Sequence, residues 1–432
     1  MSQKNKEKYE SGWRETSEPG NQRNEVCVTE TIGKSISERK ILSGLMGLGL
    51  LVLSACGGGS NSSGPPPPLP NGQTGSIVAA EPKSPANCYI QDTDPCSTSS
   101  PVTGTNAITA LAAATVGTTN ILYWGDGGGN IYYDSGPTLP PPSSSSSFTS
   151  CTSPSSPITS LAVVPSTTAP LLFYTTSGGI YEGRLSTTTL GACQSNTFSA
   201  PTNSTSSMTG ALAYSNGLIV GVTPSATYFT CTAASPSTCT SQGTLPGLVD
   251  ISPQITAIGA DPQYAIVYVV AIGVNTSRIY FYQVGTNGVL TSIGNYTGTE
   301  LNSPSGIALF VGKTGTSNYC TIGPCTFMDV TNAGNTTVTQ YVLTYTIPST
   351  GTPTGVSVNQ FNNAYYNCDL ISPDAIAAFP LPNSSGALNT PEVFVGENGI
   401  SSVSSSSLPS CFGLSSGPYG NNITAYIVKN EE

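Results

Sequence analysis

The stretch Ile108-Thr109-Ala110-Leu111-Ala112 recurs along this chain with few changes. The copies most similar to it are Ile158-Thr159-Ser160-Leu161-Ala162, Met208-Thr209-Gly210-Ala211-Leu212 and Ile255-Thr256-Ala257-Ile258-Gly259. These four copies begin at intervals of 50, 50 and 47 residues, and two weaker copies follow, 69 residues apart: Ser305–Leu309 and Asp374–Ala378. Regular spacing of this kind predicts a domain assembled from repeated structural units.

Each unit resembles a small set of strands. A second apolar run, such as Ile121–Trp124 or Leu171–Tyr174, follows five of the six copies, usually after about a dozen residues. A glycine-containing turn and a third run, such as Gly178-Gly179-Ile180-Tyr181, come next in several copies. Ser, Thr, Gly, Asn, Val and Tyr dominate the composition, and no long stretch has the 3.6-residue period of a helix. The sequence therefore predicts an all-β fold of short strands and tight turns.

Repeats of 40 to 50 residues with three or four strands resemble the blades of a β-propeller. This resemblance implies a propeller of about six blades over residues 105–432, with the final strand Ile423–Val428 pairing with the first blade to close the ring. Seven blades are an alternative, because the 69-residue interval can hold an enlarged blade or a hidden one. Tandem β-sandwiches are the other alternative, although these repeat at about 90 to 100 residues.

The run Leu53-Ser54-Ala55-Cys56 ends an apolar stretch, Ile41–Ala55, that follows Arg39-Lys40. The stretch is shorter than the roughly 20 residues of a membrane-spanning helix. The run resembles the signal of bacterial lipoproteins, which implies cleavage between Ala55 and Cys56 and attachment of lipid, including palmitate, to the Cys56 thiol. By the same resemblance, Gly57 after the lipidated cysteine favours the outer membrane, on its periplasmic or cell-surface side. The alternative is a short buried helix.

We therefore divide the chain into three parts. Residues 1–55 form a leader and signal peptide. Residues 1–38 make this leader unusually long, and the alternative is that the start codon has been assigned too far upstream. Residues 56–104 hold the lipidated cysteine, a Gly/Ser/Pro tether and a cysteine-containing lead-in, and residues 105–432 form the repeat domain. A glycine-serine segment followed by Pro65–Pro68 is typical of a flexible spacer that becomes stiffer along its length.

Ten cysteines remain beyond Cys27 in the leader and Cys56. An even number in an exported chain predicts disulfides. Neither a C-x-x-C pair nor any histidine occurs, so a zinc site has little support. Short loops favour the pairs Cys88–Cys96, Cys231–Cys239 and Cys320–Cys325, which leaves Cys151–Cys193 and Cys368–Cys411.

Composition also excludes several functions. The chain beyond residue 55 has five basic and sixteen acidic residues, a net charge of −11, so we expect no nucleic-acid partner. Without histidine, neither a Ser-His-Asp triad nor a Cys-His pair can form. We find no set of catalytic residues, no set of metal ligands and no cofactor-binding motif. Calcium is the one cofactor that we still consider.

Acidic residues are the candidates for that calcium. Asp92 and Asp94 lie two residues apart but lack the spacing of an EF-hand loop, which favours a solvated loop. Five others lie near the ends of apolar runs, where propeller loops gather around a channel, and we expect most of them to cap their own turns: Asp126, Asp250, Asp261, Asp329 and Asp374.

These observations predict a lipid-anchored binding or scaffold protein of the bacterial cell envelope, without an evident catalytic site. Its expected partners are the membrane, through the lipid, and a protein or polysaccharide ligand. The alternative is a six-bladed propeller enzyme that uses a carboxylate or calcium site on a sugar or lactone. Fold alone does not decide between them.

Overall fold

The computed structural model divides the chain into two units, residues 1–65 and 66–432, and describes parts of the second. The described residues are 77–79, 88–89, 106–135, 149–151, 156–189, 191–194, 198–311, 326–335, 337–348, 351–360, 365–366, 373–379, 393–397 and 423–428. They contain strands and turns. Within these ranges no helix is long and apolar enough to span a membrane.

Five antiparallel sheets are each built from consecutive strands, and we name them blades 1 to 5. Blade 1 contains β3 (Ile108–Val116), β4 (Thr119–Asp126), β5 (Ile131–Ser135) and β6 (Thr149–Cys151). Blade 2 contains β7 (Ser160–Val164), β8 (Leu171–Thr176) and β9 (Gly179–Arg184). Blade 3 contains β10 (Ala211–Ser215), β11 (Leu218–Val222), β12 (Thr227–Thr232) and β13 (Cys239–Thr244).

The two remaining blades follow the same order. Blade 4 contains β14 (Gln254–Ala260), β15 (Ile266–Ile272), β16 (Ser277–Val284) and β17 (Leu290–Tyr296). Blade 5 contains β18 (Pro304–Val311), β19 (Thr326–Asn332), β20 (Thr337–Thr346), β21 (Gly355–Gln360) and β22 (Tyr365–Tyr366). Because β22 pairs with β20, the long 69-residue interval holds an enlarged blade in the described part of the chain.

A further sheet, which we name the closing sheet, combines strands from both ends of the second unit. Its order is β2 (Cys88–Tyr89), β1 (Ile77–Ala79), β25 (Ile423–Val428), β24 (Val393–Glu397) and β23 (Pro373–Ala378). The prediction that Ile423–Val428 pairs with the first blade is wrong, since β25 pairs with β1 and β24. Strands β1 and β2 come from the predicted lead-in, so the sheeted region begins before residue 105.

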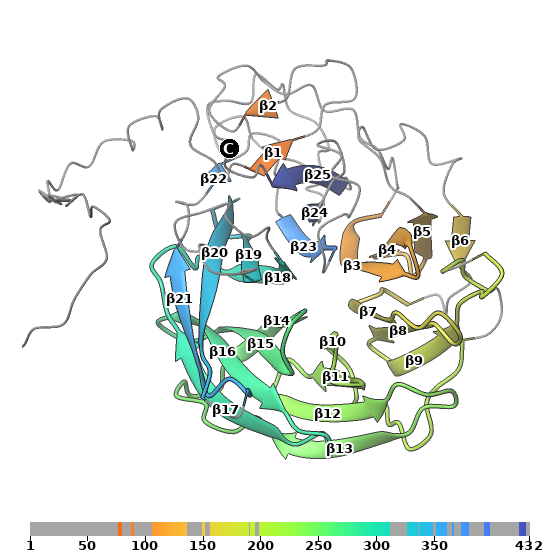
Figure 1. The fold of residues 1–432 in the computed structure, drawn as a ribbon, viewed down its shortest axis with the longest axis horizontal. Coiled ribbons are helices and arrows are strands. Elements are labelled where there is room, and N and C mark those ends of the chain that lie inside the picture. Colours follow the sequence, from red (N-terminus) through yellow and green to blue (C-terminus); the bar gives the residue numbers. More distant parts are fainter. Residues whose placement is uncertain are drawn as a thin grey trace, which may run out of the picture. The chain divides into compact units, whose positions relative to one another are not determined.

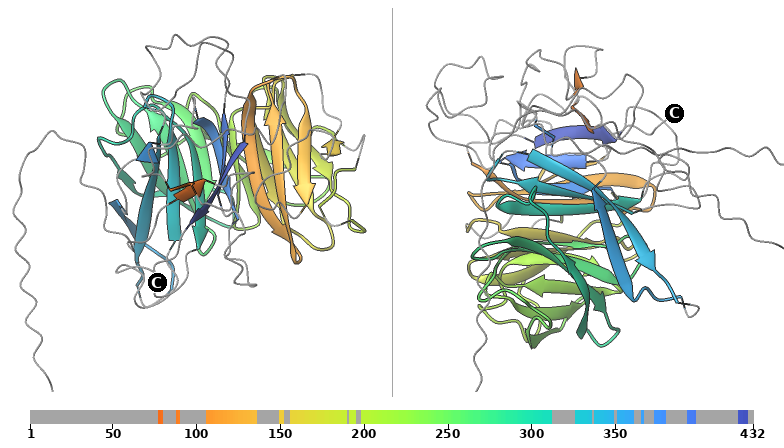
Figure 2. Two further views of the ribbon diagram at one scale, coloured as in Figure 1. Left: turned by 90° about the horizontal axis from the view of Figure 1, so that it is seen from above. Right: turned by 90° about the vertical axis from the view of Figure 1, so that its left-hand side faces the viewer.

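The sheets surround a common centre in chain order (Figure 1), and Figure 2 shows the same unit from two other sides. The innermost strand is the first strand of each blade and β23 of the closing sheet: β3, β7, β10, β14, β18 and β23. Each inner strand packs against the next, and β23 packs against β3. The all-β propeller prediction is therefore confirmed. Five of the expected six or so blades are made of consecutive strands.

Apolar side chains fill the space between neighbouring sheets. Val220 of blade 3 meets Val267 and Tyr280 of blade 4 in one such cluster. Trp124 of blade 1 and Phe394 of the closing sheet belong to another, which joins the two ends of the ring. A strand buried on both sides reads as a continuous apolar run, which is why the second run of each copy is so hydrophobic.

Four of the six inner strands have the same irregularity near their first residues. In each of these four the pairing register skips one residue, which is a β-bulge. The pairing aligns Pro304 and Pro373 with Ile108 and Ile255, one residue before the start of the two weaker copies. The bulged residues are therefore equivalent in the structure: Thr109, Thr256, Ser305 and Asp374. A bulge leaves one residue unpaired in the backbone ladder and changes the direction of its side chain, which allows that side chain to reach the neighbouring sheet.

Three of the bulged hydroxyls make that contact. Thr109 Oγ1 donates to the carbonyl of Ile158, Thr256 Oγ1 donates to the carbonyl of Pro304 at 2.8 Å, and Ser305 Oγ donates to the carbonyl of Pro373 at 2.7 Å. In each case the acceptor immediately precedes the equivalent position of the next sheet. Blades 2 and 3 are joined in a related way, because Thr175 Oγ1 donates to the carbonyl of Gly210 at 2.6 Å.

Replacing Thr256 by valine tests this contact between sheets. Valine keeps the shape but leaves the Pro304 carbonyl without its donor, so we expect the free energy of unfolding to fall by about 1 kcal/mol. Equilibrium urea unfolding measures the change. Thr256→Ser, which keeps the hydroxyl, should stay close to the parent, and a valine variant as stable as the parent would contradict the assigned role.

Candidate functional site

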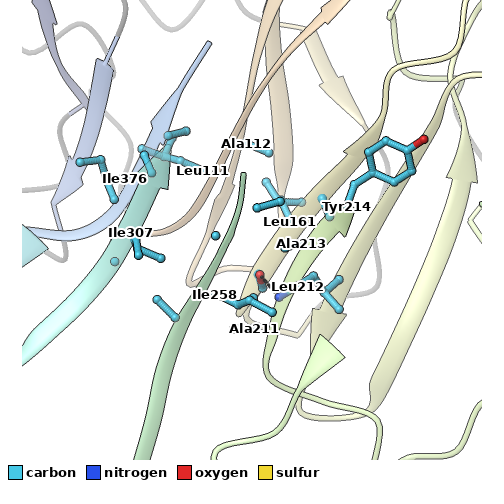
Figure 3. Close-up of a pocket in the computed structure, with 18 of the residues that line it drawn as sticks. Leu111, Ala112, Leu161, Ala211, Leu212, Ala213, Tyr214, Ile258, Ile307 and Ile376 are labelled. Carbon is cyan, nitrogen blue, oxygen red and sulfur yellow. Dashed lines mark hydrogen bonds between the residues drawn. The ribbon is translucent and has the colours of Figure 1, made fainter. Parts of the chain in front are cut away.

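A central channel of about 820 Å³ is lined by all six inner strands. Figure 3 shows the side chains that approach it, among them Ala112, Leu161, Ala213, Ile258 and Ile307. These side chains are short or aliphatic, so the middle of the channel is apolar. Polar groups gather towards the two ends of the inner strands, where a ligand would meet them first.

The hydrogen bonds between sheets join strand starts to strand starts, so the inner strands run in the same direction along the channel. We call the end formed by these starts the entry ring. It is lined by hydroxyl residues and one acid: Thr109, Thr159, Ser160, Thr256, Ser305 and Asp374. The one sequence signal for this ring is the Thr at the second position of the four most similar copies, and the sequence predictions above do not include the ring.

At the other end of the channel, Asp261 follows β14 and is fully engaged by its neighbours. Its carboxylate accepts hydrogen bonds from the backbone N–H groups of Gln263 and Tyr264, at 2.8 and 3.1 Å. The hydroxyls of Tyr268 and Tyr345 donate to its second oxygen. Burial raises the pKa of Asp261. The backbone hydrogen bonds show that Asp261 caps a turn. Because Tyr345 belongs to blade 5, Asp261 also links blade 4 to blade 5.

Two other predicted acids also have structural partners. Asp126 accepts hydrogen bonds from the backbone N–H groups of Gly128 and Asn130, at 3.0 and 2.8 Å, and so caps the turn between β4 and β5. Asp250 pairs with Arg278, whose Nε lies 2.9 Å from Asp250 Oδ2. The Tyr280 hydroxyl donates to the same oxygen at 2.6 Å. The turn-capping prediction thus holds for Asp126 and Asp261 but not for Asp250.

Asp329 lies in the middle of blade 5 with a fully buried side chain. Gln340 on the neighbouring strand donates to Asp329 Oδ1 at 2.9 Å, whereas the structure gives no partner to Asp329 Oδ2 or to Gln340 Oε1. Burial raises the pKa of Asp329 to about 7. A proton on this carboxyl removes a buried charge and supplies a donor where Gln340 Oε1 has none.

Asp374 is the predicted acid that lies in the entry ring. It is half-buried at the start of β23, and burial raises the pKa of its carboxyl to about 6. Among the described residues, its side chain has no hydrogen-bond or ion-pair partner. The five predicted acids therefore do not converge, and the described ranges contain no group of three or more His, Cys, Asp or Glu side chains able to hold a metal ion.

The described cysteines form two of the predicted bonds. Cys151 pairs with Cys193 and Cys231 pairs with Cys239, with Cα atoms 5.4 and 4.0 Å apart. The backbone of Cys88 lies in β2, but its side chain is outside the described part. The other predicted site residues also lie outside it: Ala55, Cys56, Asp92, Asp94, Cys96, Cys320, Cys325, Cys368 and Cys411.

Fold and site together define an all-β propeller with an open central channel. No family model and no curated protein matches the chain. Among solved structures it is similar to U3-55K, at 10% identity and a TM-score of 0.42, with 76% of this chain and 97% of that one covered.

Two further solved structures are similar at the same low level. A Lactobacillus plantarum protein has 12% identity and a TM-score of 0.41, with coverages of 82% and 100%. The Swd1 β-propeller domain of Myceliophteria thermophila has 10% identity and a TM-score of 0.37, with coverages of 62% and 76%. Such values carry no functional argument, so the assignment rests on the sheet topology.

The buried Asp329 predicts a stability that falls as the pH rises. Its folded-state pKa lies above the unfolded value of about 3.9, so the stabilisation is complete below about pH 4 and is lost up to about pH 7, a change on the order of 4 kcal/mol. Thermal unfolding across this range measures it.

Asp329→Asn is the matched variant, because an amide stays neutral and can still pair with Gln340. It should retain only the smaller pH dependence that the other acids with raised pKa values, Asp134, Asp261 and Asp374, contribute. A variant that loses stability with pH as steeply as the parent would exclude Asp329 as the source.

Proposed function

We propose that this chain is a lipid-anchored binding or scaffold protein of the bacterial cell envelope, and that its ligand enters the central channel. The observation that carries the proposal is the open channel of about 820 Å³, with an apolar middle and a polar entry ring. Concave sites with apolar walls and a few polar groups are the usual form of ligand pockets. The channel is also large enough for a small organic molecule.

The envelope location is supported by two independent features. The Leu53-Ser54-Ala55-Cys56 run resembles a lipoprotein signal and supplies the thiol for the lipid. The Cys151–Cys193 and Cys231–Cys239 disulfides are of the kind that form in oxidising compartments such as the periplasm. The Gly/Ser/Pro segment after Cys56 would then tether the propeller to the membrane.

We further propose that the closing sheet acts as the sixth blade. Its inner strand β23 packs against both β18 and β3, so it completes the sequence of inner strands. Strands from the two ends of the second unit pair within this sheet, and this pairing would close the ring.

The enzyme alternative needs several acids around one point. In the described residues Asp126, Asp250, Asp261 and Asp329 each serve a local structural contact, which leaves Asp374 as the channel acid without a partner. This distribution favours a binding function over a calcium-dependent hydrolase, since calcium takes six to eight oxygen ligands.

Replacing Cys56 by alanine tests the anchor. The variant cannot form the thioether, so we expect palmitate labelling to disappear and the domain to move from the membrane fraction to the soluble fraction. Cys27→Ala is the control, because this cysteine lies in the part that the signal removes. Unchanged labelling of the Cys56 variant would overturn the lipoprotein assignment.

Calcium provides a test of the alternative. A binding protein without a calcium site should show no change in melting temperature when calcium replaces EDTA, because only ligands of the folded state raise it. A calcium-dependent increase that disappears in Asp374→Asn would instead favour the carboxylate enzyme.

A further inference from the structure

The entry ring contains one exception to the pattern that the chain repeats. When the strand pairing aligns the two weaker copies from Pro304 and Pro373, the second position of the repeat is Thr109, Thr159, Thr209, Thr256 and Ser305 in five copies and Asp374 in the sixth. At three of these positions the hydroxyl is used between sheets, as described above. An ionised carboxyl cannot donate such a hydrogen bond. Asp374 therefore occupies a position that donates a hydrogen bond to the next sheet in other copies, and its ionised carboxyl cannot donate one.

Asp374 shares the entry ring with two hydroxyl residues on the strands beside β23, Ser305 in β18 and Thr109 in β3. Ser305 Oγ donates its proton to the carbonyl of Pro373, the residue before Asp374, and accepts from Thr331 Oγ1 at 3.1 Å, which leaves one lone pair as a further acceptor. Thr109 Oγ1, on the strand at the other side of β23, likewise donates to Ile158. A ring that holds one carboxylate and hydroxyl oxygens whose protons are already used is complemented by a group with several N–H donors.

Charge around the channel favours a cation. The two basic residues in the described ranges are Arg184 and Arg278, and neither lines the channel. Arg278 pairs with Asp250 and Arg184 Nε donates to Ser235. The Asp374 carboxylate is thus uncompensated within the described residues, in a chain whose net charge is −10. Its half-buried position weakens the competition of water for a bound cation.

We propose that Asp374 binds the ammonium group of a primary amine at the entry ring, with Ser305 and Thr109 as flanking acceptors and the organic part of the amine in the channel. This inference rests on the proposed binding function of the channel and names the class of ligand. A primary ammonium carries three N–H donors, which matches one carboxylate and two hydroxyl oxygens. A calcium ion would require more carboxylate oxygens than this ring supplies.

The ionisation of Asp374 makes the binding depend on pH. Burial raises the pKa of its carboxyl to about 6, so the carboxylate forms as the pH rises through this value. The strands packed against β23 carry two other acids, Asp329 in β19 and Glu397 in β24, the latter paired in register with Pro373. Strands β3 and β18 carry none.

The test is calorimetric titration of the purified full-length chain with hexylammonium, 1-hexanol and hexanoate. We expect hexylammonium to bind about tenfold or more tightly than hexanol, as a charge-assisted contact provides, and hexanoate not to bind. Hexylammonium affinity should fall by about tenfold between pH 7.5 and pH 5, where the carboxyl is protonated.

Asp374→Ser is the decisive variant, because serine is the residue that the preceding sheet uses at this position and should preserve the fold. It should lose the preference for hexylammonium over hexanol. Thr175→Val is the matched control, since it removes a hydrogen bond between blades 2 and 3 and does not line the channel. It should bind hexylammonium like the parent, with a lower melting temperature.

Other outcomes would overturn the inference. Equal affinity for hexanol and hexylammonium, or unchanged hexylammonium binding in Asp374→Ser, would remove the ammonium assignment and leave the channel as a binding site. Binding of calcium alone, lost in Asp374→Ser, would do the same in favour of a metal. Failure of the envelope proposal is detected separately, by palmitate labelling of Cys56.

Discussion

The hydrogen bond from one inner strand to the start of the next is the contact on which the ring depends. Sheets that pack through apolar side chains alone can slide and rotate against one another, because dispersion contacts have little directionality. In three inner strands a β-bulge places one hydroxyl where it donates to a carbonyl at the start of the next inner strand. Each of these sheets thereby fixes the height of the next one along the channel.

This arrangement also explains the composition of the chain. Buried carbonyl groups at the sheet junctions need donors, and Thr and Ser provide them without introducing charge. Burying a carboxylate charge costs free energy unless hydrogen bonds or protonation compensate for it. Asp261 accepts such hydrogen bonds from its tyrosines, and Asp329 accepts one from Gln340. The low content of charged residues therefore follows from the large share of the chain that is buried between the sheets.

The same repeated position links architecture with the candidate site. At Thr109, Thr256 and Ser305 the hydroxyl serves the junction between sheets, and the residue also lines the entry ring. Where the residue is Asp374, the side chain has no junction to serve and lines the channel. A change in a single copy of a structural motif thus creates chemical asymmetry in an otherwise repetitive ring.

The sequence by itself determined the repeat period, the all-β class, the inner strands and two cysteine pairs, because these follow from local patterns of apolar residues and short loops. Only the tertiary structure decided the rest. The pairing of β25 with β1 joins residues about 350 positions apart, and no local signal specifies such a contact. Likewise, the sequence does not distinguish the acids from one another. Only their neighbours among the described residues separate the capping Asp126, the fully buried Asp329 and Asp374, which has no partner there. Burial and hydrogen bonding set the chemistry of a carboxyl group, and both are properties of the folded chain.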